Sequence, residues 1–189
     1  MTATAGPLSI VRAALALLAR HWRSAYAAAL AATLVNTVPD IGRQVLVWDD
    51  PRVGAALLVD VVGFLTGLVA QLWVTGALAA LPGGGGVLPA GALRRGSGLA
   101  WRAVRAEPGT VLTGVVLGGA VSALVTLPAS VAALGLDRVV GPLDSLGVGA
   151  FAVAAASDVL ASVVTLPFLA LVLVIVADRH RLVVGTGGQ

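Results

Sequence analysis

The chain has 189 residues, 58% of them hydrophobic and only 11% charged, and its mean hydropathy is +0.99. Soluble domains carry about 25% charged residues, so a soluble fold of this composition would expose large apolar patches and aggregate. The net charge of +3 comes from arginines that are too few and too close to segment ends to indicate nucleic-acid binding. The absence of cysteine excludes disulfides and thiolate metal sites. The composition therefore predicts an all-α integral membrane protein, and its Ala/Val/Leu/Gly/Arg bias is typical of a high-GC bacterial genome.

Residues 7–23 are predicted to form a basic amphipathic helix on the cytoplasmic membrane surface. Pro7 suits the first turn of a helix. Three arginines fall within about 80° of one another on a helical wheel: Arg12, Arg20 and Arg23. Trp22 follows in the position of an interfacial aromatic residue. The pattern favours an element that lies in the headgroup region and anchors the chain to anionic lipid.

Two predicted spans follow this surface helix. The first, residues 24–38, is short for a hydrocarbon core about 30 Å thick, so it either includes the preceding turn or continues past Pro39 with a kink. Residues 40–52 form a polar connection. The second span, residues 53–81, is long enough to cross with tilt. It ends at Pro82 and a run of four glycines, which predicts a flexible turn.

The same order repeats in the second half of the chain. Residues 89–107 form a second basic amphipathic helix, with Trp101 in an interfacial position and four arginines on one arc: Arg94, Arg95, Arg102 and Arg105. The third span covers residues 110–134, with a kink or end at Pro128, and residues 135–146 are the second polar connection. The fourth span covers residues 148–176 and stops at the charged run 178–181. The fold class is therefore four transmembrane helices in two hairpins, each preceded by a surface helix.

The arginine distribution predicts the orientation. Nine of the twelve arginines lie at the termini and in the 82–107 connection, whereas the two opposite connections are rich in aspartate. The positive-inside rule places both termini in the cytoplasm of a bacterial inner membrane.

The spacing of the basic sets indicates an internal repeat. Arg12, Arg20 and Arg23 precede Arg94, Arg102 and Arg105 by 82 residues. Topogenic constraint alone can also place arginines at the ends of two hairpins, but we favour duplication. The predicted organisation is a first repeat at 1–82, a second repeat at 83–181 and a tail at 182–189. Because each repeat holds two spans, the copies run the same way about an axis along the membrane normal.

Two carboxylates inside the predicted spans are the most informative polar residues. Asp60 and Asp158 occupy matched places in the outer thirds of their segments. They either face a shared cavity that binds a cation, a proton or a headgroup, or they anchor the outer helix ends and pair with nearby arginines. These arginines are Arg43, Arg52 and Arg138. A carboxylate costs less in the outer third than at the bilayer centre, and this favours the structural role.

The remaining polar residues predict packing and no catalytic site. Asn36 and Gln71 are uncharged intramembrane residues, which more often hydrogen-bond between helices than bind a ligand. Gly63–Gly67 and Gly114–Gly118 match the spacing that lets helices approach closely. His21 and His180 lie among arginines without metal-ligand spacing, and Ser97 has no histidine placed to act as its base. We therefore expect no metal, no cofactor and no catalytic residue.

The order of a basic stretch, a tryptophan, a short span, a polar turn and a long span resembles the membrane domain that accompanies some glycerophosphodiester phosphodiesterases. The resemblance is carried by Leu18-Ala19-Arg20-His21-Trp22-Arg23 and Trp101-Arg102-Ala103-Val104-Arg105-Ala106-Glu107-Pro108. It implies a non-enzymatic membrane module, because that domain has no catalytic residues to transfer.

The expected function is that of an accessory, scaffold or subunit of a membrane complex, with a membrane protein or a second copy as its partner. The alternative is a small homo-oligomeric transporter or channel with Asp60, Asp158, Gln71 and Asn36 along a polar path. An intramembrane enzyme is a distant third interpretation, since it would need a carboxylate joined to a second titratable group.

Overall fold

The computed structural model describes residues 6–48, 53–134 and 148–186, and over these ranges the chain is helical without a strand. The elements in chain order are α1 (Pro7–Arg20), α2 (Trp22–Trp48), α3 (Val53–Ala77), the 3-10 turn η1 (Leu81–Gly83), α4 (Ala92–Ala106), α5 (Pro108–Leu134) and α7 (Val148–Thr186). The predicted all-α class is confirmed.

Three stretches of the described chain are long and apolar enough to cross a membrane. They are Val61–Gly83 in α3 and its following turn, Pro108–Ala129 in α5, and Ala155–His180 in α7. The chain is therefore a multi-pass, membrane-embedded protein. Helix α2 is not among these candidates. Much of its apolar content is alanine, and it also carries Tyr26 and Asn36. Four spans consequently stay a prediction.

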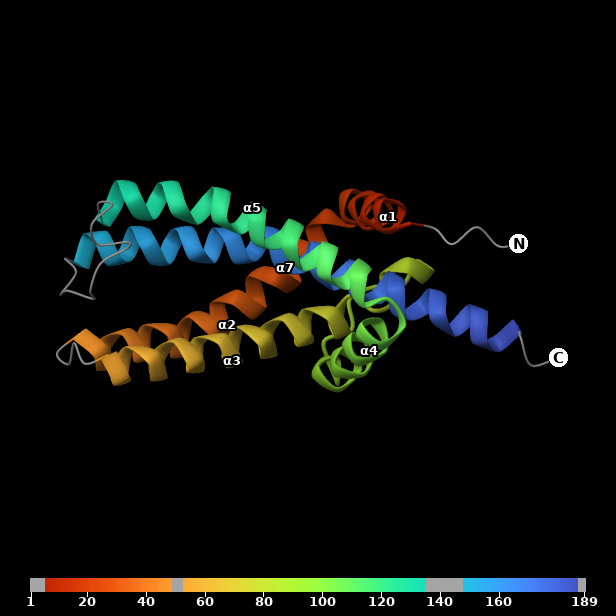
Figure 1. The fold of residues 1–189 in the computed structure, drawn as a ribbon, viewed down its shortest axis with the longest axis horizontal. Helices are drawn as coiled ribbons and strands as arrows, with labels where there is room; N and C mark the ends of the chain where they lie inside the picture. The colour runs from red at the N-terminus through yellow and green to blue at the C-terminus, as the bar shows by residue number, and fades with distance from the viewer. Residues whose placement is uncertain (1–5, 49–52, 135–147, 187–189) are drawn as a thin grey trace.

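The helices form two long hairpins with a short helix beside each. Figure 1 shows α2 and α3 running side by side along the long axis, and α5 and α7 running side by side above them. Helices α1 and α4 both lie toward the end of the molecule that carries the N- and C-terminal ends of the chain (Figure 1). The far ends of α2 and α5, where each hairpin turns back, lie at the opposite end.

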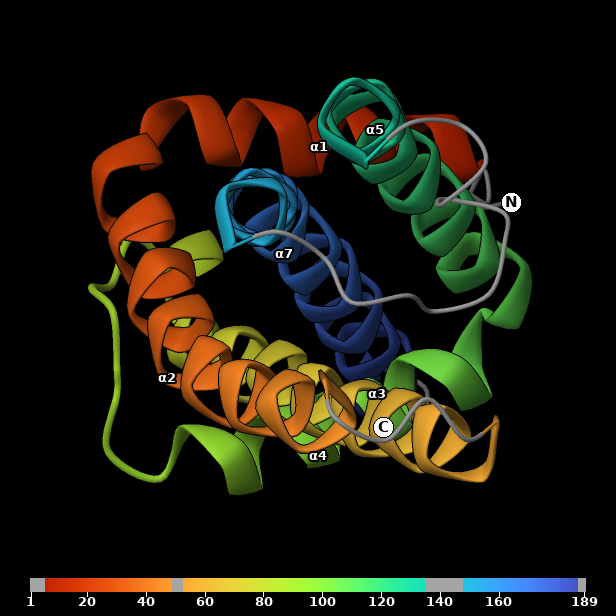
Figure 2. The ribbon, with the colours of Figure 1, turned by 90° about the vertical axis from the view of Figure 1, so that its left-hand side faces the viewer.

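Helix α7 is the centre of the fold, because it contacts α1, α2, α3, α4 and α5. Figure 2, viewed along the long axis, shows it enclosed by α1, α5 and the α2/α3 pair. In the most apolar 18-residue segment of α7, 56% of the residues are buried, against 22% in the corresponding segment of α5. The other spans are therefore outer helices that present much of their apolar surface outward.

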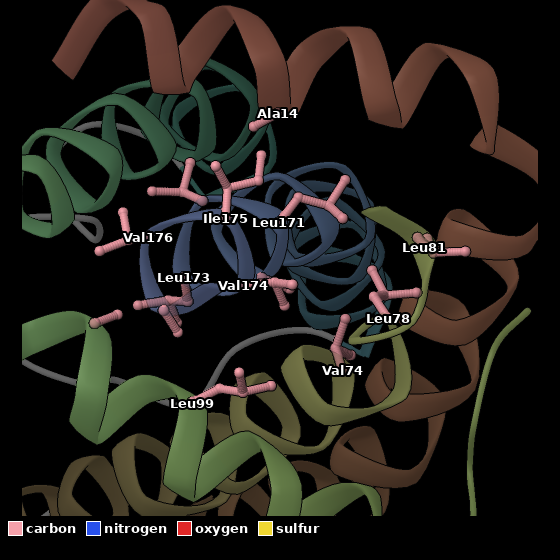
Figure 3. Close-up of a cluster of buried hydrophobic side chains, with 14 of the residues drawn as sticks. Ala14, Val74, Leu78, Leu81, Leu99, Leu171, Leu173, Val174, Ile175 and Val176 are labelled. Carbon is pink, nitrogen blue, oxygen red and sulfur yellow. The ribbon is translucent and has the colours of Figure 1, made fainter. Parts of the chain in front are cut away.

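The buried core lies at the end of the molecule that holds α1 and α4. Residues 170–177 of α7 are all buried, and buried side chains from α1, α2, α3, α4 and α5 form one cluster with them, part of which Figure 3 shows. The contributing residues include Ala14 from α1, Val74 and Leu78 from α3, and Leu99 from α4. Toward the opposite end, large apolar side chains on α3 and α5 are exposed, as expected for surfaces that lipid or another membrane helix covers.

Helix ends differ from the predicted boundaries mainly at prolines. Helices α2, α5 and α7 continue through Pro39, Pro128 and Pro167. Helix α2 thus follows the second alternative predicted for the first span, and residues 40–48 are helical where a polar connection was expected. Proline is tolerated within membrane helices because neighbouring groups satisfy the freed carbonyls. Helix α7 also runs to Thr186, past the charged run predicted to end it.

Each of the short helices α1 and α4 joins the long helix that follows it through a single residue. His21 separates α1 from α2, and Glu107 separates α4 from α5. The Thr110 hydroxyl donates to the Glu107 carboxylate at 2.9 Å. A carboxylate at the start of α5 also interacts favourably with the positive end of the helix dipole. The two junctions therefore turn the chain sharply from the surface helix into the following helix.

Candidate functional site

The two surface helices use one face to pack against the rest of the protein. The buried residues of α1 are Ile10, Ala14 and Leu18, and those of α4 are Ala92, Gly96, Leu99 and Ala103. Helix α1 contacts α7 of the second hairpin, whereas α4 contacts α3 of the first hairpin. Each surface helix thus holds a long helix from the other half of the chain.

A second apolar face on each surface helix is exposed. On α1 and the start of α2 it consists of Leu8, Leu15 and Trp22, and on α4 of Leu93, Trp101 and Val104. On a helical wheel with about 100° per residue, this exposed face lies roughly 100° around the helix axis from the buried face. The rotation has the same direction in both helices. The sequence pattern predicted one apolar side. The structure divides it into a side that contacts protein and a side open to lipid.

Most of the predicted headgroup anchors lie on the surface. Arg12, Arg20, Arg23, Arg94 and Arg105 are exposed, and Arg102 is half-buried. The guanidinium of Arg23 lies 5.2 Å from the ring centroid of Trp22, and that of Arg105 lies 4.3 Å from the ring of Trp101. An arginine stacked on an amphipathic ring is well suited to the membrane interface, where the ring contacts lipid and the charge meets phosphate.

Arg95 has a different position from the other predicted anchors. Its guanidinium donates to the backbone carbonyls of Gly76 at 3.3 Å, of Ala90 at 2.7 Å and of Leu88. These carbonyls belong to the end of α3 and to the connection between α3 and α4. Arg95 therefore joins this connection to α3. A sequence pattern of basic residues cannot distinguish this role from contact with lipid headgroups.

Helices α3 and α4 cross with their backbones in contact. A Cβ atom added to Gly76 would lie 1.8 Å from the carbonyl oxygen of Ala92, and one added to Gly96 would lie 1.7 Å from that of Leu72. Only glycine fits at both positions. This crossing was not predicted, because the two glycines lie on different helices and match no local motif. The predicted glycine motifs were Gly63–Gly67 and Gly114–Gly118. Gly114 packs against Val172, whereas Gly67 and Gly118 face open space.

Gln71 makes the interhelical hydrogen bond expected of an intramembrane amide. Its Nε2 donates to the carbonyl of Leu166 at 3.4 Å and to the hydroxyl of Thr75 at 3.3 Å. Leu166 immediately precedes Pro167, so this bond joins α3 to the proline turn of α7. Gln71 therefore has a packing role in this structure.

Asn36 lies in the wall of a cleft between α2 and α3. The cleft has a volume of about 500 Å³ and is lined almost wholly by apolar groups. Helix α2 contributes Ala31, Asn36 and Pro39, and helix α3 contributes Leu65, Ala70 and Trp73. Asp158 is not among the lining residues. Asn36 and Asp158 each interact with a neighbouring group, and the polar path predicted for them stays a prediction.

The predicted aspartate pair is described only in part. Asp158 is exposed on α7 and has an interaction with a neighbouring group. The side chain of Asp60 lies outside the described residues, as do those of Arg43, Arg52 and Arg138. The choice between a shared cavity and separate anchors thus stays a prediction.

Within the described ranges, no group of three histidine, aspartate or glutamate side chains could hold a metal ion. Comparison with known protein families, with curated proteins and with solved structures finds no match.

Proposed function

We propose that this chain is a non-enzymatic accessory or scaffold subunit of a complex in the bacterial cytoplasmic membrane. It crosses the bilayer four times with both termini in the cytoplasm. Its partner is another membrane protein or a second copy of the chain, and anionic headgroups anchor its surface helices.

The observation that carries this proposal is the unequal burial of the spans. Only 22% of the most apolar 18-residue segment of α5 is buried within the chain, and 33% of that of α3, although both are long apolar helices. Exposed side chains such as Phe64 and Val116 form continuous apolar faces along them. These faces offer partner helices a large contact area, whereas the amide of Gln71 inside the fold is used for packing between α3 and α7.

The arrangement of the surface helices supports the orientation and the repeat. Helices α1 and α4, whose sequences carry the basic sets, both lie toward one end of the molecule (Figure 1), as the positive-inside rule requires of helices at a cytoplasmic face. Ile10 and Ala14 are buried at positions 82 residues before Ala92 and Gly96, which are also buried. The reciprocal packing of α1 on α7 and α4 on α3 supports two copies that run the same way.

A photocrosslinking experiment tests the accessory role. A photoreactive phenylalanine analogue replaces Val116 on α5 in the native host, and Ala14 serves as the control position because it is buried in the chain. We expect a discrete crosslinked product from position 116 and none from position 14, with the same partner co-purifying in mild detergent. Isolation of a lone species with solute or ion flux in liposomes would contradict the proposal.

The transporter alternative is favoured by one observation, which is the exposed carboxylate of Asp158 within an apolar helix. If Asp60 and Asp158 line a path, then Asp60→Asn and Asp158→Asn abolish flux in liposomes while folding is preserved. If both variants instead express poorly and no flux is lost, the two carboxylates have a structural role.

A further inference from the structure

Two arginines and a tryptophan lie together on one side of α4, between its buried face and its exposed apolar face. On a helical wheel, Arg102 and Arg105 are about 60° apart, and Trp101 is about 40° beyond Arg105. Residues three apart on a helix are neighbours, so the two guanidinium groups belong to one surface. We call Trp101, Arg102 and Arg105 the α4 basic patch.

Arg102 holds a donor that has no partner within the described protein. Its Nε atom is buried, and none of the residues that the structure describes accepts a hydrogen bond from it. The side chain as a whole is only half-buried, so the group also reaches the surface. Leaving a charged donor desolvated and unpaired costs free energy. An anion at the outer nitrogens recovers part of that cost, because the charge is spread over the whole planar group.

Arg105 is held in place by the indole of Trp101. Its guanidinium lies 4.3 Å from the ring centroid. Stacking uses the face of the planar group, so the N–H donors at its edge stay available. Gly98, one turn before Arg102, is exposed, and a Cβ there would meet nothing within 4 Å. Because helical side chains lean toward the N-terminus of their helix, Arg102 leans toward this open space.

Helix α1 lacks this arrangement. Ala19 and Ala16 stand 82 residues before Trp101 and Gly98, and Arg20, the counterpart of Arg102, is exposed. The charge on α1 is therefore solvated, whereas that on α4 is partly desolvated and held in position.

We propose that the α4 basic patch binds the phosphate of one anionic phospholipid, with Arg102 and Arg105 as the two donors. Arginine forms strong, directed hydrogen bonds with phosphate oxygens. The exposed apolar face beside the patch indicates a lipid as the source of the phosphate, because Trp101 is 60% exposed and Val104 is 46% exposed. Helix α4 also lies across the long axis that α3 and α5 follow, as expected of a helix in the plane of the membrane surface (Figure 1, Figure 2).

A zwitterionic lipid fits the patch less well, because its ammonium brings a third cation beside two guanidinium groups. The inference rests on the proposed anchoring of the surface helices by anionic headgroups, and it narrows that anchoring to one site on α4. It requires no protein partner.

Native mass spectrometry of the full chain in detergent tests the site. Phosphatidylglycerol and phosphatidylcholine with the same acyl chains are titrated separately, and the dissociation constant of the first bound lipid is measured for each. We expect phosphatidylglycerol to bind about tenfold more tightly, the factor that corresponds to one charged hydrogen bond.

Three variants separate a positioned site from diffuse charge. Arg102→Gln should abolish the preference, whereas Arg20→Gln on α1 should reduce it by less than about twofold, as expected of an exposed charge. Arg102→Lys keeps the charge but loses the planar group, so it should also lose most of the preference. Thermal unfolding gives a second measurement. Phosphatidylglycerol should raise the unfolding temperature of the unchanged chain but not that of Arg102→Gln.

Equal affinity of the unchanged chain for the two lipids would overturn the proposal. Equal losses in Arg102→Gln and Arg20→Gln would also overturn it, because the preference would then be a diffuse attraction to basic helices. Full retention by Arg102→Lys would show that charge alone suffices, and a lower unfolding temperature of lipid-free Arg102→Gln would assign Arg102 to the fold. A chain that shows the preference but yields no crosslinked partner contradicts the accessory role alone.

Discussion

Helices α1 and α4 occupy equivalent positions in the two halves of the chain, yet they pack in different ways. Helix α4 crosses α3 through Gly76 and Gly96, backbone against backbone. Helix α1 crosses α7 through side chains, with Ala14 above Ile175 and Leu171 (Figure 3). Similar amphipathic patterns thus produce one crossing that only glycine permits and one that side chains fill. The difference shows that the amphipathic pattern of such a helix does not predict how closely it contacts the rest of the protein.

The largest effect is expected from a methyl group at the closer crossing. In Gly96→Ala, the new Cβ would lie 1.7 Å from the carbonyl oxygen of Leu72, so α3 and α4 must separate. We expect a loss of about 3 kcal/mol of stability, the upper range for overpacking a close contact. Thermal unfolding in detergent, followed by tryptophan fluorescence, measures it.

Gly98→Ala is the matched control on the same helix, because a Cβ there meets nothing within 4 Å. It should leave the unfolding temperature unchanged or raise it slightly, since alanine is the better helix former. Equal destabilisation by both variants would show that the helices do not cross at Gly96.

Arg95 is the next test, because the α1 half has Ala13 at the corresponding position. Arg95→Ala removes the hydrogen bonds to the carbonyls of Gly76, Ala90 and Leu88, and we expect a loss of about 2 kcal/mol, the value of a charged hydrogen bond. Limited proteolysis of the connection between α3 and α4 should accelerate. Arg94→Ala, one residue earlier, should preserve resistance to proteolysis; if it does not, the effect belongs to the charge of the helix and not to the carbonyl contacts.

Ala14 on α1 tests the same comparison of the two helix crossings in the first half of the chain. Ala14→Gly makes the α1 crossing resemble the α4 crossing, but α1 has no opposing glycine to close the gap. We expect a loss of about 1 kcal/mol, mainly from helix propensity. An increase in stability would mean that α1 and α7 move together as closely as α3 and α4, and unfolding in detergent decides between these results.

The smallest effect is expected at Gln71, which joins α3 to α7 away from both crossings. Gln71→Leu removes the hydrogen bond to Leu166 and should cost about 0.6 kcal/mol, the average for such bonds within membrane proteins. If the leucine variant is as damaging as Gly96→Ala, then the amide contact of α3 with α7 matters as much as the glycine crossing of α3 with α4.

The sequence predicted the helical class, the three most apolar spans and the two surface helices, because composition and arginine spacing act over whole segments. It left open whether the first predicted span ends before Pro39 or continues through it, since neighbouring groups decide whether a proline ends a membrane helix. The sequence also did not predict the Gly76–Gly96 crossing or the role of Arg95, because both depend on how separate helices meet. Gln71 lies in a candidate span and makes the interhelical hydrogen bond expected of it, whereas the intramembrane position of Asn36 on α2 stays a prediction.

The central claim is that α1 and α4 lie on the same, cytoplasmic side of the membrane, which requires α2 to span. The chain has no cysteine, so a single introduced thiol reports its own position. We predict that a membrane-impermeant maleimide labels Asp50→Cys and Asp144→Cys on intact cells, and labels Ser9→Cys and Ser97→Cys only after permeabilisation. Opposite accessibility of Ser9→Cys and Ser97→Cys would contradict the account, because the chain would then cross the membrane three times, with its two surface helices on different sides.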